Sequence, residues 1–146
     1  MDIGKLNSEC YSFKNAILNT DKNNLSIALK EFPYGSCGWC NDLLLYHFKK
    51  INFSSIQDIY YVSVSIDDVT HAWLEIDGII IDLTLSQFHK KLKKVIFYDR
   101  RFHRKFKINS KDKIIFSEIE DFLISSTIEE NYKNLVSDYS EIMKNY

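Results

Sequence analysis

Cys37 is the residue whose type and position could support the most demanding chemistry. It lies in the stretch 32–41, which holds the chain's one proline and two of its four glycines. A strongly apolar pattern follows from Asp42 to Phe48, so the chain should turn tightly and then enter a buried helix, with Cys37 at the junction. The free N–H groups and the positive dipole end of a helix start favour an anion such as a thiolate. The position suits a nucleophile, although a small buried apolar cysteine is the ordinary alternative.

The chain has three cysteines, at positions 10, 37 and 40. An odd, low number fits a reducing compartment better than a disulfide scaffold. Cys37 and Cys40 form a C-x-x-C pair, but a zinc site needs a second ligand pair, which the four histidines and Cys10 do not offer at suitable spacing. A thioredoxin-type pair needs a strand before the motif, and the preceding segment is expected to be helical. We therefore predict no metal and no cofactor, and expect Cys10 and Cys40 to be structural.

His71 and Asp82 stand on two predicted strands joined by Asp77-Gly78, one of the strongest hairpin signals. A two-residue turn places them on one face as diagonal neighbours, about 7–8 Å apart by Cα, so the imidazole can reach the carboxylate. The alternatives are a core histidine that finds a partner by chance and an Asp that caps the following turn. A one-residue slip would separate the pair. Together with a helix-start cysteine, the pair favours a nucleophile, a base and an orienting group.

Helices are expected to dominate the first third of the chain. Residues 5–18 carry apolar side chains at helical spacing. Asn24 can cap a second, short helix that Pro33 stops. The third helix begins at Cys37 and runs to about Lys50, and its all-round apolar middle predicts a central position in the fold.

Strands are expected after residue 54. The predicted strands cover 59–66, 70–76, 79–83 and 95–98. Residues 117–123 fit a short helix or a last strand, and 129–144 fit an amphipathic terminal helix. We predict one α+β domain over 1–146, in which N-terminal helices and a central Cys-bearing helix pack on an antiparallel sheet and a C-terminal helix follows.

These residues support a family resemblance over 32–88. Gly35-Ser36-Cys37 opens a helix, His71-Ala72-Trp73-Leu74-Glu75 lies on a strand and Asp82-Leu83-Thr84 on the next, which resembles the transglutaminase-like cysteine hydrolases, particularly small stand-alone bacterial members. The resemblance implies a papain/transglutaminase-like core. It implies that Cys37 is the nucleophile, His71 the general base and acid, and Asp82 the orienting residue. Gly38 and Trp73 are the oxyanion or supporting residues.

The chain departs from the family pattern around the nucleophile. Papain-like members have a Gln or similar donor upstream, but Glu31 stands six positions before Cys37 and cannot donate when ionised. The side-chain half of the oxyanion hole is therefore unassigned, and the Cys37 backbone N–H is a candidate for the other half. Many members have Trp directly after the Cys, whereas here Gly38 intervenes. Cys40 thus becomes a rival nucleophile, but it lies one turn inside the helix, where the dipole has less effect.

Residues 89–107 form a basic stretch with nine Lys or Arg and one acid, interleaved with aromatic residues. The pattern is similar to a nucleic-acid stripe, but a solvated face is the first interpretation and a surface for an acidic substrate or partner is the second. The eight acids of 112–146 could neutralise it in the fold. His103, between Phe102 and Phe106, is expected to be structural.

Composition narrows the class of protein. The net charge of -1 gives no general attraction to nucleic acid. Residues 1–5 lack the shape of a signal peptide, and no apolar run approaches membrane-spanning length, so a cytoplasmic protein is expected, with export as an effector left open.

The favoured function is a thiol-dependent amide hydrolase or acyl transferase, first of all a cysteine peptidase that acts on a peptide or protein. Glutamine deamidation or transamidation by a toxin-type effector would use the same residues. A non-catalytic module of the same fold that binds through 89–107 is the other class.

Overall fold

The computed structural model describes residues 1–126 and 129–146. Its α-helices within these ranges are α1 (Ile3–Asn19), α2 (Cys37–Lys50), α3 (Ile119–Ser126) and α4 (Glu129–Met143). Its strands are β1 (Ile59–Ile66), β2 (Val69–Ile76), β3 (Ile79–Ile81), β4 (Ile96–Phe97) and β5 (Lys107–Ile114). All strand pairs are antiparallel, and the order across the sheet is β4-β3-β2-β1-β5. The predicted α+β class is confirmed.

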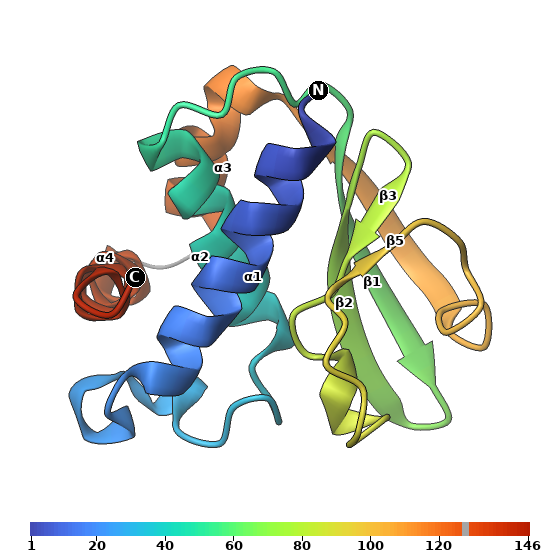
Figure 1. Ribbon diagram of the computed structural model, residues 1–146, viewed down its shortest axis with the longest axis horizontal. Coiled ribbons are helices and arrows are strands. Elements are labelled where there is room, and N and C mark those ends of the chain that lie inside the picture. The colour runs from blue at the N-terminus through green and yellow to red at the C-terminus, as the bar shows by residue number, and fades with distance from the viewer. Residues whose placement is uncertain (127–128) are drawn as a thin grey trace.

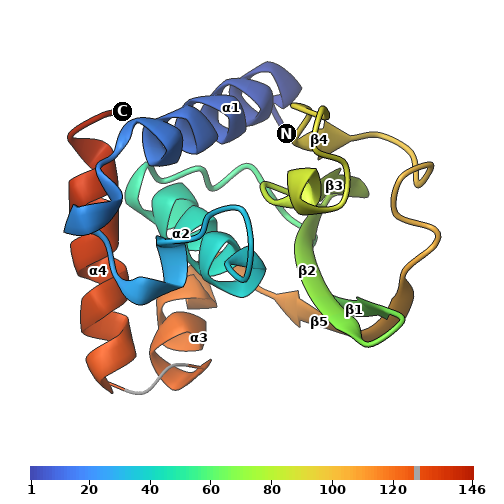
Figure 2. The ribbon, with the colours of Figure 1, turned by 90° about the horizontal axis from the view of Figure 1, so that it is seen from below.

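The helices lie on one side of the sheet (Figure 1), and α2 lies between α4 and the sheet when the molecule is seen from below (Figure 2). The larger hydrophobic core fills this space. α1 contributes one buried stripe at helical spacing, whereas α2 is buried without a break from Leu43 to Phe48. The predicted central position of the Cys37 helix is therefore confirmed.

A second, smaller core covers the opposite face of the sheet. Alternation along β2 divides its side chains between the two cores, because Leu74 and Ile76 join the larger core and Trp73 joins the smaller one. Phe97 and Phe106 come from the chain after β3 and close the smaller core. His71 has the same parity as Trp73 and faces the smaller core.

The β2–β3 hairpin has the predicted turn and register. Asp77 and Gly78 both have positive φ, at 50° and 82°, and Ile76 pairs with Ile79. β3 is shorter than predicted, because the N–H of Asp82 donates to the carbonyl of Val95 (2.9 Å) instead of continuing the ladder with β2. The first residues of β2, 69–73, therefore have no partner on the β3 side, and the sheet has a notch there.

Two local predictions were wrong or incomplete. The helix predicted after Asn24 is replaced by two 3-10 turns, Lys22–Asn24 and Ile27–Leu29. Ser26 explains this, because its backbone N–H and hydroxyl both donate to the carboxylate of Asp138 on α4 (2.8 and 2.5 Å). β5 was not predicted at all, and its side chains are largely exposed, so it lacks a strand's apolar alternation.

The remaining elements agree with prediction. Residues 117–123 are helical, as part of the 3-10 turn Phe116–Glu118 and α3, so the strand alternative is excluded.

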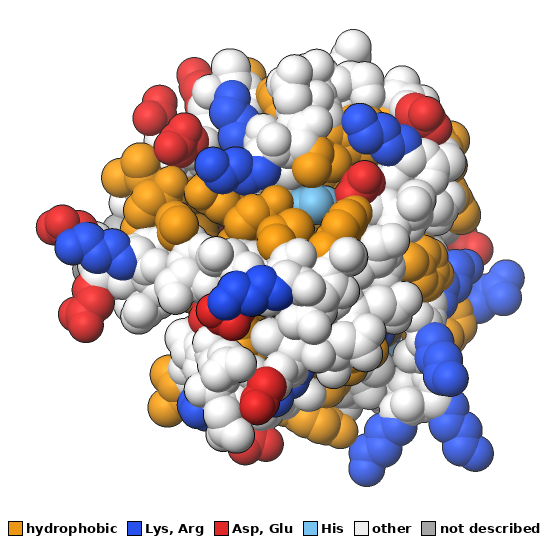
Figure 3. Space-filling view, turned by 60° about the vertical axis from the view of Figure 1, so that its left-hand side comes forward, with side chains coloured by type: hydrophobic (Ala, Val, Ile, Leu, Met, Phe, Trp, Pro, Cys, Tyr) orange, Lys and Arg blue, Asp and Glu red, His pale blue; other side chains and the backbone are white. Residues whose placement is uncertain are grey.

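On one face of the molecule, hydrophobic side chains gather across the centre, with Lys and Arg side chains along the lower right edge (Figure 3). None of the helices within 1–126 and 129–146 has the length and apolarity needed to cross a membrane.

Candidate active site

Cys37 is the first residue of α2, as predicted. The turn before it is held by Ser36, whose hydroxyl donates to the carbonyl of Pro33 (3.1 Å) and whose carbonyl accepts the N–H of Cys40 (2.8 Å). The Ser36 side chain does not cap the helix. Cys37 is half-buried, whereas Cys10 and Cys40 are fully buried and all three thiols are free.

Burial separates the three thiols chemically. It raises the pKa of Cys10 and of Cys40 far above the usual range for a thiol, and in Cys40 it outweighs a hydrogen bond with Ser36. A thiolate is the reactive form of cysteine, so both buried thiols are poor nucleophiles at neutral pH. The exposure of Cys37 makes it the accessible thiol of the C-x-x-C pair.

His71 and Asp82 form the contact predicted from the hairpin register. Nε2 of His71 lies 2.8 Å from Oδ2 of Asp82, and the two residues are only 2% and 1% exposed. The same carboxylate receives the backbone N–H of Thr84 on Oδ1 (3.1 Å). Although burial acts in the opposite direction, hydrogen bonds from His103 and His71 hold the pKa of the Asp82 carboxyl below its usual value.

Cys37 and His71 come together beside the first half of β2. Both line one hollow of about 310 Å³, together with residues of β1, β2 and β5. Burial alone would lower the pKa of His71, but hydrogen bonds with Asp82 and with Cys37, and the charges of both, raise it to about 9. Because Asp82 occupies Nε2, Nδ1 is the ring nitrogen left for the thiol.

Gln87 is a site residue that the sequence interpretation missed. It ends the 3-10 turn Leu85–Gln87, and its Nε2 lies 3.0 Å from Nδ1 of His71. A side-chain amide therefore occupies Nδ1, the ring nitrogen that a proton transfer with Cys37 would have to use. No sequence signal distinguished Gln87, because the family pattern places such a donor upstream of the cysteine.

His103 also belongs to the site. Its Nε2 lies 3.0 Å from Oδ2 of Asp82, the oxygen that His71 uses, and the residue is buried. Its ring lies edge-on against Trp73, with centroids 4.7 Å apart. Within the part of the chain that the structure describes, Nδ1 of His103 is buried without a hydrogen-bond partner, so the neutral ring with hydrogen on Nε2 fits this position. The expectation that His103 is structural thus needs an addition: it is also a donor to Asp82.

The predicted supporting residues lie beside the site. Trp73 is fully buried and its ring lies 5.9 Å from that of His71, while its Nε1 points toward Glu75 (3.5 Å), so it packs against the histidines rather than donating into the hollow. Gly38 lines the hollow, and its carbonyl accepts the hydroxyl of Tyr61 (3.1 Å). A Cβ at Gly38 would lie 3.3 Å from that hydroxyl oxygen, so a larger residue would crowd the helix start.

The basic stretch 89–107 is partly anchored in the fold. Arg100 pairs with the buried carboxylate of Glu75, and Lys94 and Lys105 lie over the rings of Phe97 and Phe106. Within the described residues, no ion pair joins this stretch to the acids of 112–146. The suggested internal neutralisation by those acids is therefore not seen.

The arrangement has the parts required for nucleophilic catalysis: an accessible thiol at a helix start, a histidine that lines the same hollow, and a carboxylate that orients the histidine. No protein-family model, curated protein or solved structure matches the chain. The family resemblance drawn from the sequence thus stays a prediction, and the case for function depends on the geometry.

Proposed function

We propose that the protein is a thiol-dependent amide hydrolase, most simply a cysteine peptidase, with Cys37 as nucleophile, His71 as general base and acid, and Asp82 as orienting residue. The observation that carries the proposal is the buried hydrogen-bonded set of His71, Asp82 and His103, with the half-buried Cys37 in the hollow that His71 lines. A buried carboxylate is costly unless it is paired, and both oxygens of Asp82 accept hydrogen bonds, one of them from His71, which favours an orienting role over a chance contact.

The pKa of His71 is raised to about 9, so the ring already holds a proton at neutral pH, before the substrate is attacked. This supports its proposed role in proton transfer. An imidazolium beside Cys37 stabilises the thiolate, which attacks the carbonyl carbon of the amide. His71 then gives its Nδ1 proton to the leaving amine, and a thioester on Cys37 remains. Water attacks the thioester while His71 takes its proton, and the carboxylic acid leaves as the thiol re-forms.

The negative oxygen of the tetrahedral intermediate needs donors. The backbone N–H of Cys37 at the start of α2 is one candidate. The side-chain amide of Gln87 is the second. Its Nε2 donates to Nδ1 of His71 only while that nitrogen is unprotonated, so protonation of Nδ1 frees the amide to supply the oxyanion donor that Glu31 cannot. Transfer of the acyl group to an amine instead of water would use the same first half of the reaction.

Alkylation at neutral pH tests the assignment. Iodoacetamide at low excess should modify Cys37 before Cys10 and Cys40, and His71→Ala should slow this reaction at pH 7. Cys40→Ser is the matched control and should leave the rate unchanged. Peptide mapping that finds the first adduct on Cys40, or a Cys37 rate that His71→Ala leaves as it was, would overturn the proposal.

A further inference from the structure

We propose that the cleft between α1 and the segments 32–33 and 86–93 binds a carboxylate of the substrate, with Lys14 as its charged partner. The inference rests on the proposed thiol chemistry of Cys37, and it specifies the chemical class of substrate that this chemistry would receive.

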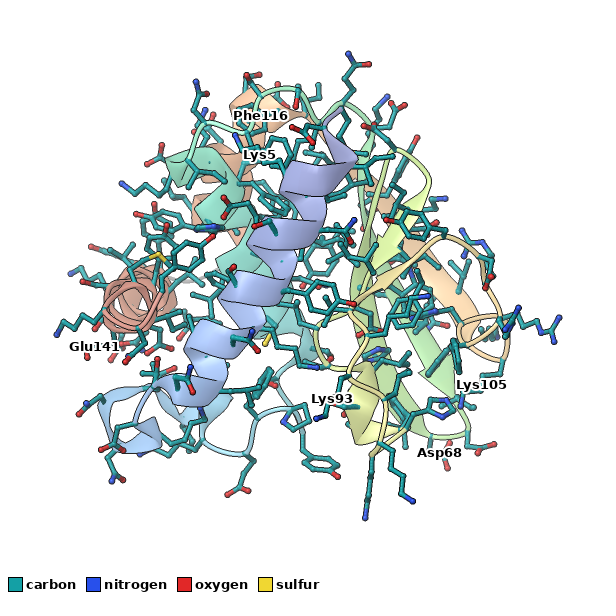
Figure 4. All side chains as sticks on the ribbon, in the orientation of Figure 1. Lys5, Asp68, Lys93, Lys105, Phe116 and Glu141 are labelled. Atoms are coloured by element: carbon teal, nitrogen blue, oxygen red, sulfur yellow. The ribbon has the colours of Figure 1, made fainter. Side chains whose placement is uncertain are left out.

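The cleft has a volume of about 450 Å³ and three walls. One wall is a single stripe of α1, whose members stand three and four residues apart: Tyr11, Lys14, Asn15 and Leu18. Phe32 and Pro33 form the second wall. The third comes from the chain after β3 and carries Ser86, Lys90, Leu92 and Lys93. Figure 4 labels Lys93 in the segment that passes beside the lower half of α1.

Lys14 is the unusual member of this cleft. It is only 9% exposed, and within the described residues no hydrogen bond or ion pair joins its ammonium to another group. Burial lowers its pKa, although the charge of Asp82 acts in the opposite direction. Most of the side chain is buried, but the ammonium nitrogen is not among the fully buried unpaired atoms of the described residues, so it is the end of the side chain that a ligand in the cleft can reach. An anion that enters the cleft would supply the missing partner.

The cleft adjoins the candidate active site through both of its loops. Pro33 is tied to the residue before Cys37, since its carbonyl accepts the Ser36 hydroxyl. Ser86 directly precedes Gln87, which bonds His71. The carboxylate of Asp82 is near enough to Lys14 to influence its pKa. The proposal accordingly places the scissile carbonyl at Cys37 and an acidic group of the same substrate in this cleft.

The walls define the ligand more closely. The lining combines apolar side chains of α1, Phe32 and Leu92 with the largely buried Lys14, while Lys90 and Lys93 are exposed. A carboxylate on a short carbon chain matches this combination of one charged contact and an apolar lining. Such a group is offered by a Glu or Asp side chain of a peptide or by its C-terminal carboxylate.

Chloroacetamide probes that alkylate Cys37 can test the cleft. The acidic probes are N-chloroacetyl peptides with up to two glycines before a terminal residue that carries either a side-chain or an α-carboxylate. The matched neutral probes carry the amide at each position. For one spacer length, we expect an acidic probe to react about 10- to 100-fold faster than its amide, the range for a hydrogen bond to a charged group. Comparison of the side-chain acid with the α-carboxylate probe shows whether the cleft prefers an acidic side chain or a C-terminal carboxylate.

Two variants locate the effect. Lys14→Met keeps an unbranched side chain one atom shorter and should remove the preference for the acid, whereas Lys30→Met, at an exposed lysine outside the cleft, should keep it. The inference fails if no acidic probe is preferred at any spacer length, or if the preference survives in Lys14→Met.

Failure of the thiol chemistry would look different, because every probe, neutral ones included, would then react slowly or on another cysteine. In that case the binding of 4-phenylbutyrate to the Cys37→Ala variant still tests whether the cleft accepts a carboxylate. Amide NMR shifts should saturate at residues of the three walls, and Lys14→Met should abolish them. If 4-phenylbutyrate causes no amide shifts in Cys37→Ala, or if Lys14→Met leaves these shifts unchanged, the cleft assignment is overturned independently of the thiol chemistry.

Discussion

Replacement of Asp82 by Asn perturbs the centre of the site with almost no change of shape. The carboxylate accepts three donors: Oδ2 takes Nε2–H of His71 and of His103, and Oδ1 takes the N–H of Thr84. Asn has one acceptor oxygen, so its amino group must face a donor in either orientation. We expect the oxygen to stay with the two histidines, because this choice opposes only the Thr84 N–H.

The size of the effect follows from the pKa of His71. Its value of about 9, against an ordinary 6.5, corresponds to about 3 kcal/mol of preference for the imidazolium in the folded protein. Burial is the largest influence on this pKa and lowers it, so it should prevail once the charge of Asp82 is gone. In Asp82→Asn the pKa of His71 should fall to 6.5 or below.

The sign of the pH dependence can be worked out for each group. Because the pKa of His71 is raised on folding, its contribution to stability is fully present below pH 6.5 and is lost as the pH rises through about 9. Because the pKa of Asp82 is lowered, its contribution is present above pH 3.8 and is lost as the pH falls. The free energy of unfolding should therefore differ most between wild type and Asp82→Asn at about pH 4 to 6.5, and the difference should shrink by up to about 3 kcal/mol above pH 9.

Urea unfolding between pH 4.5 and 10 measures this difference, and histidine ring NMR measures the pKa of His71 directly. Asp68→Asn, at an exposed turn, is the control and should show no such pH dependence. A stability difference that stays constant from pH 5 to 10, or a wild-type His71 that titrates near 6.5, would refute the electrostatic reasoning for the site.

Three further variants probe the neighbours of this pair. His103→Phe keeps a ring but removes a donor to Asp82. The variant should therefore have a lower free energy of unfolding than wild type, with the full difference present above about pH 4 and a smaller difference at lower pH. Unfolding measured across the acid range checks this. Gln87→Ala should weaken inhibition by a peptide aldehyde about 100-fold or more while it changes iodoacetamide alkylation little, since only the aldehyde adduct carries an oxyanion. Lys14→Met should raise the melting temperature by a few degrees near neutral pH, which corresponds to a stabilisation on the order of 1 kcal/mol. This gain should become smaller toward pH 10.5, where the ammonium deprotonates. A lower melting temperature would mean that Lys14 has a structural partner.

The sequence predicted the core elements of the site because local signals determine them. The turn before Cys37, the apolar middle of α2 and the Asp77-Gly78 hairpin each depend on a few neighbouring residues. The hairpin also determined the register, and the register placed His71 beside Asp82. These inferences needed no knowledge of contacts between distant parts of the chain.

The parts that the sequence did not predict depend on long-range contacts. The helix after Asn24 is lost to a bond between Ser26 and Asp138, which are 112 positions apart. β5 is defined by pairing with β1 rather than by a pattern of its own, and its exposed lysines suit an edge strand. His103 lies 21 positions after its partner Asp82, within a basic stretch whose composition suggests a surface.

The position of the site depends on the early end of β3. α2 lies on the side of the larger core, whereas His71 has the parity of the opposite face, so a fully paired β2 would separate the thiol from the imidazole. β3 pairs with only three residues of β2, and Asp82 leaves the ladder to bond Val95. This leaves the edge of β2 open where His71 stands, and the first residue after β3 is the carboxylate that holds the ring. The short third strand therefore both opens the route between Cys37 and His71 and supplies the orienting residue at its end.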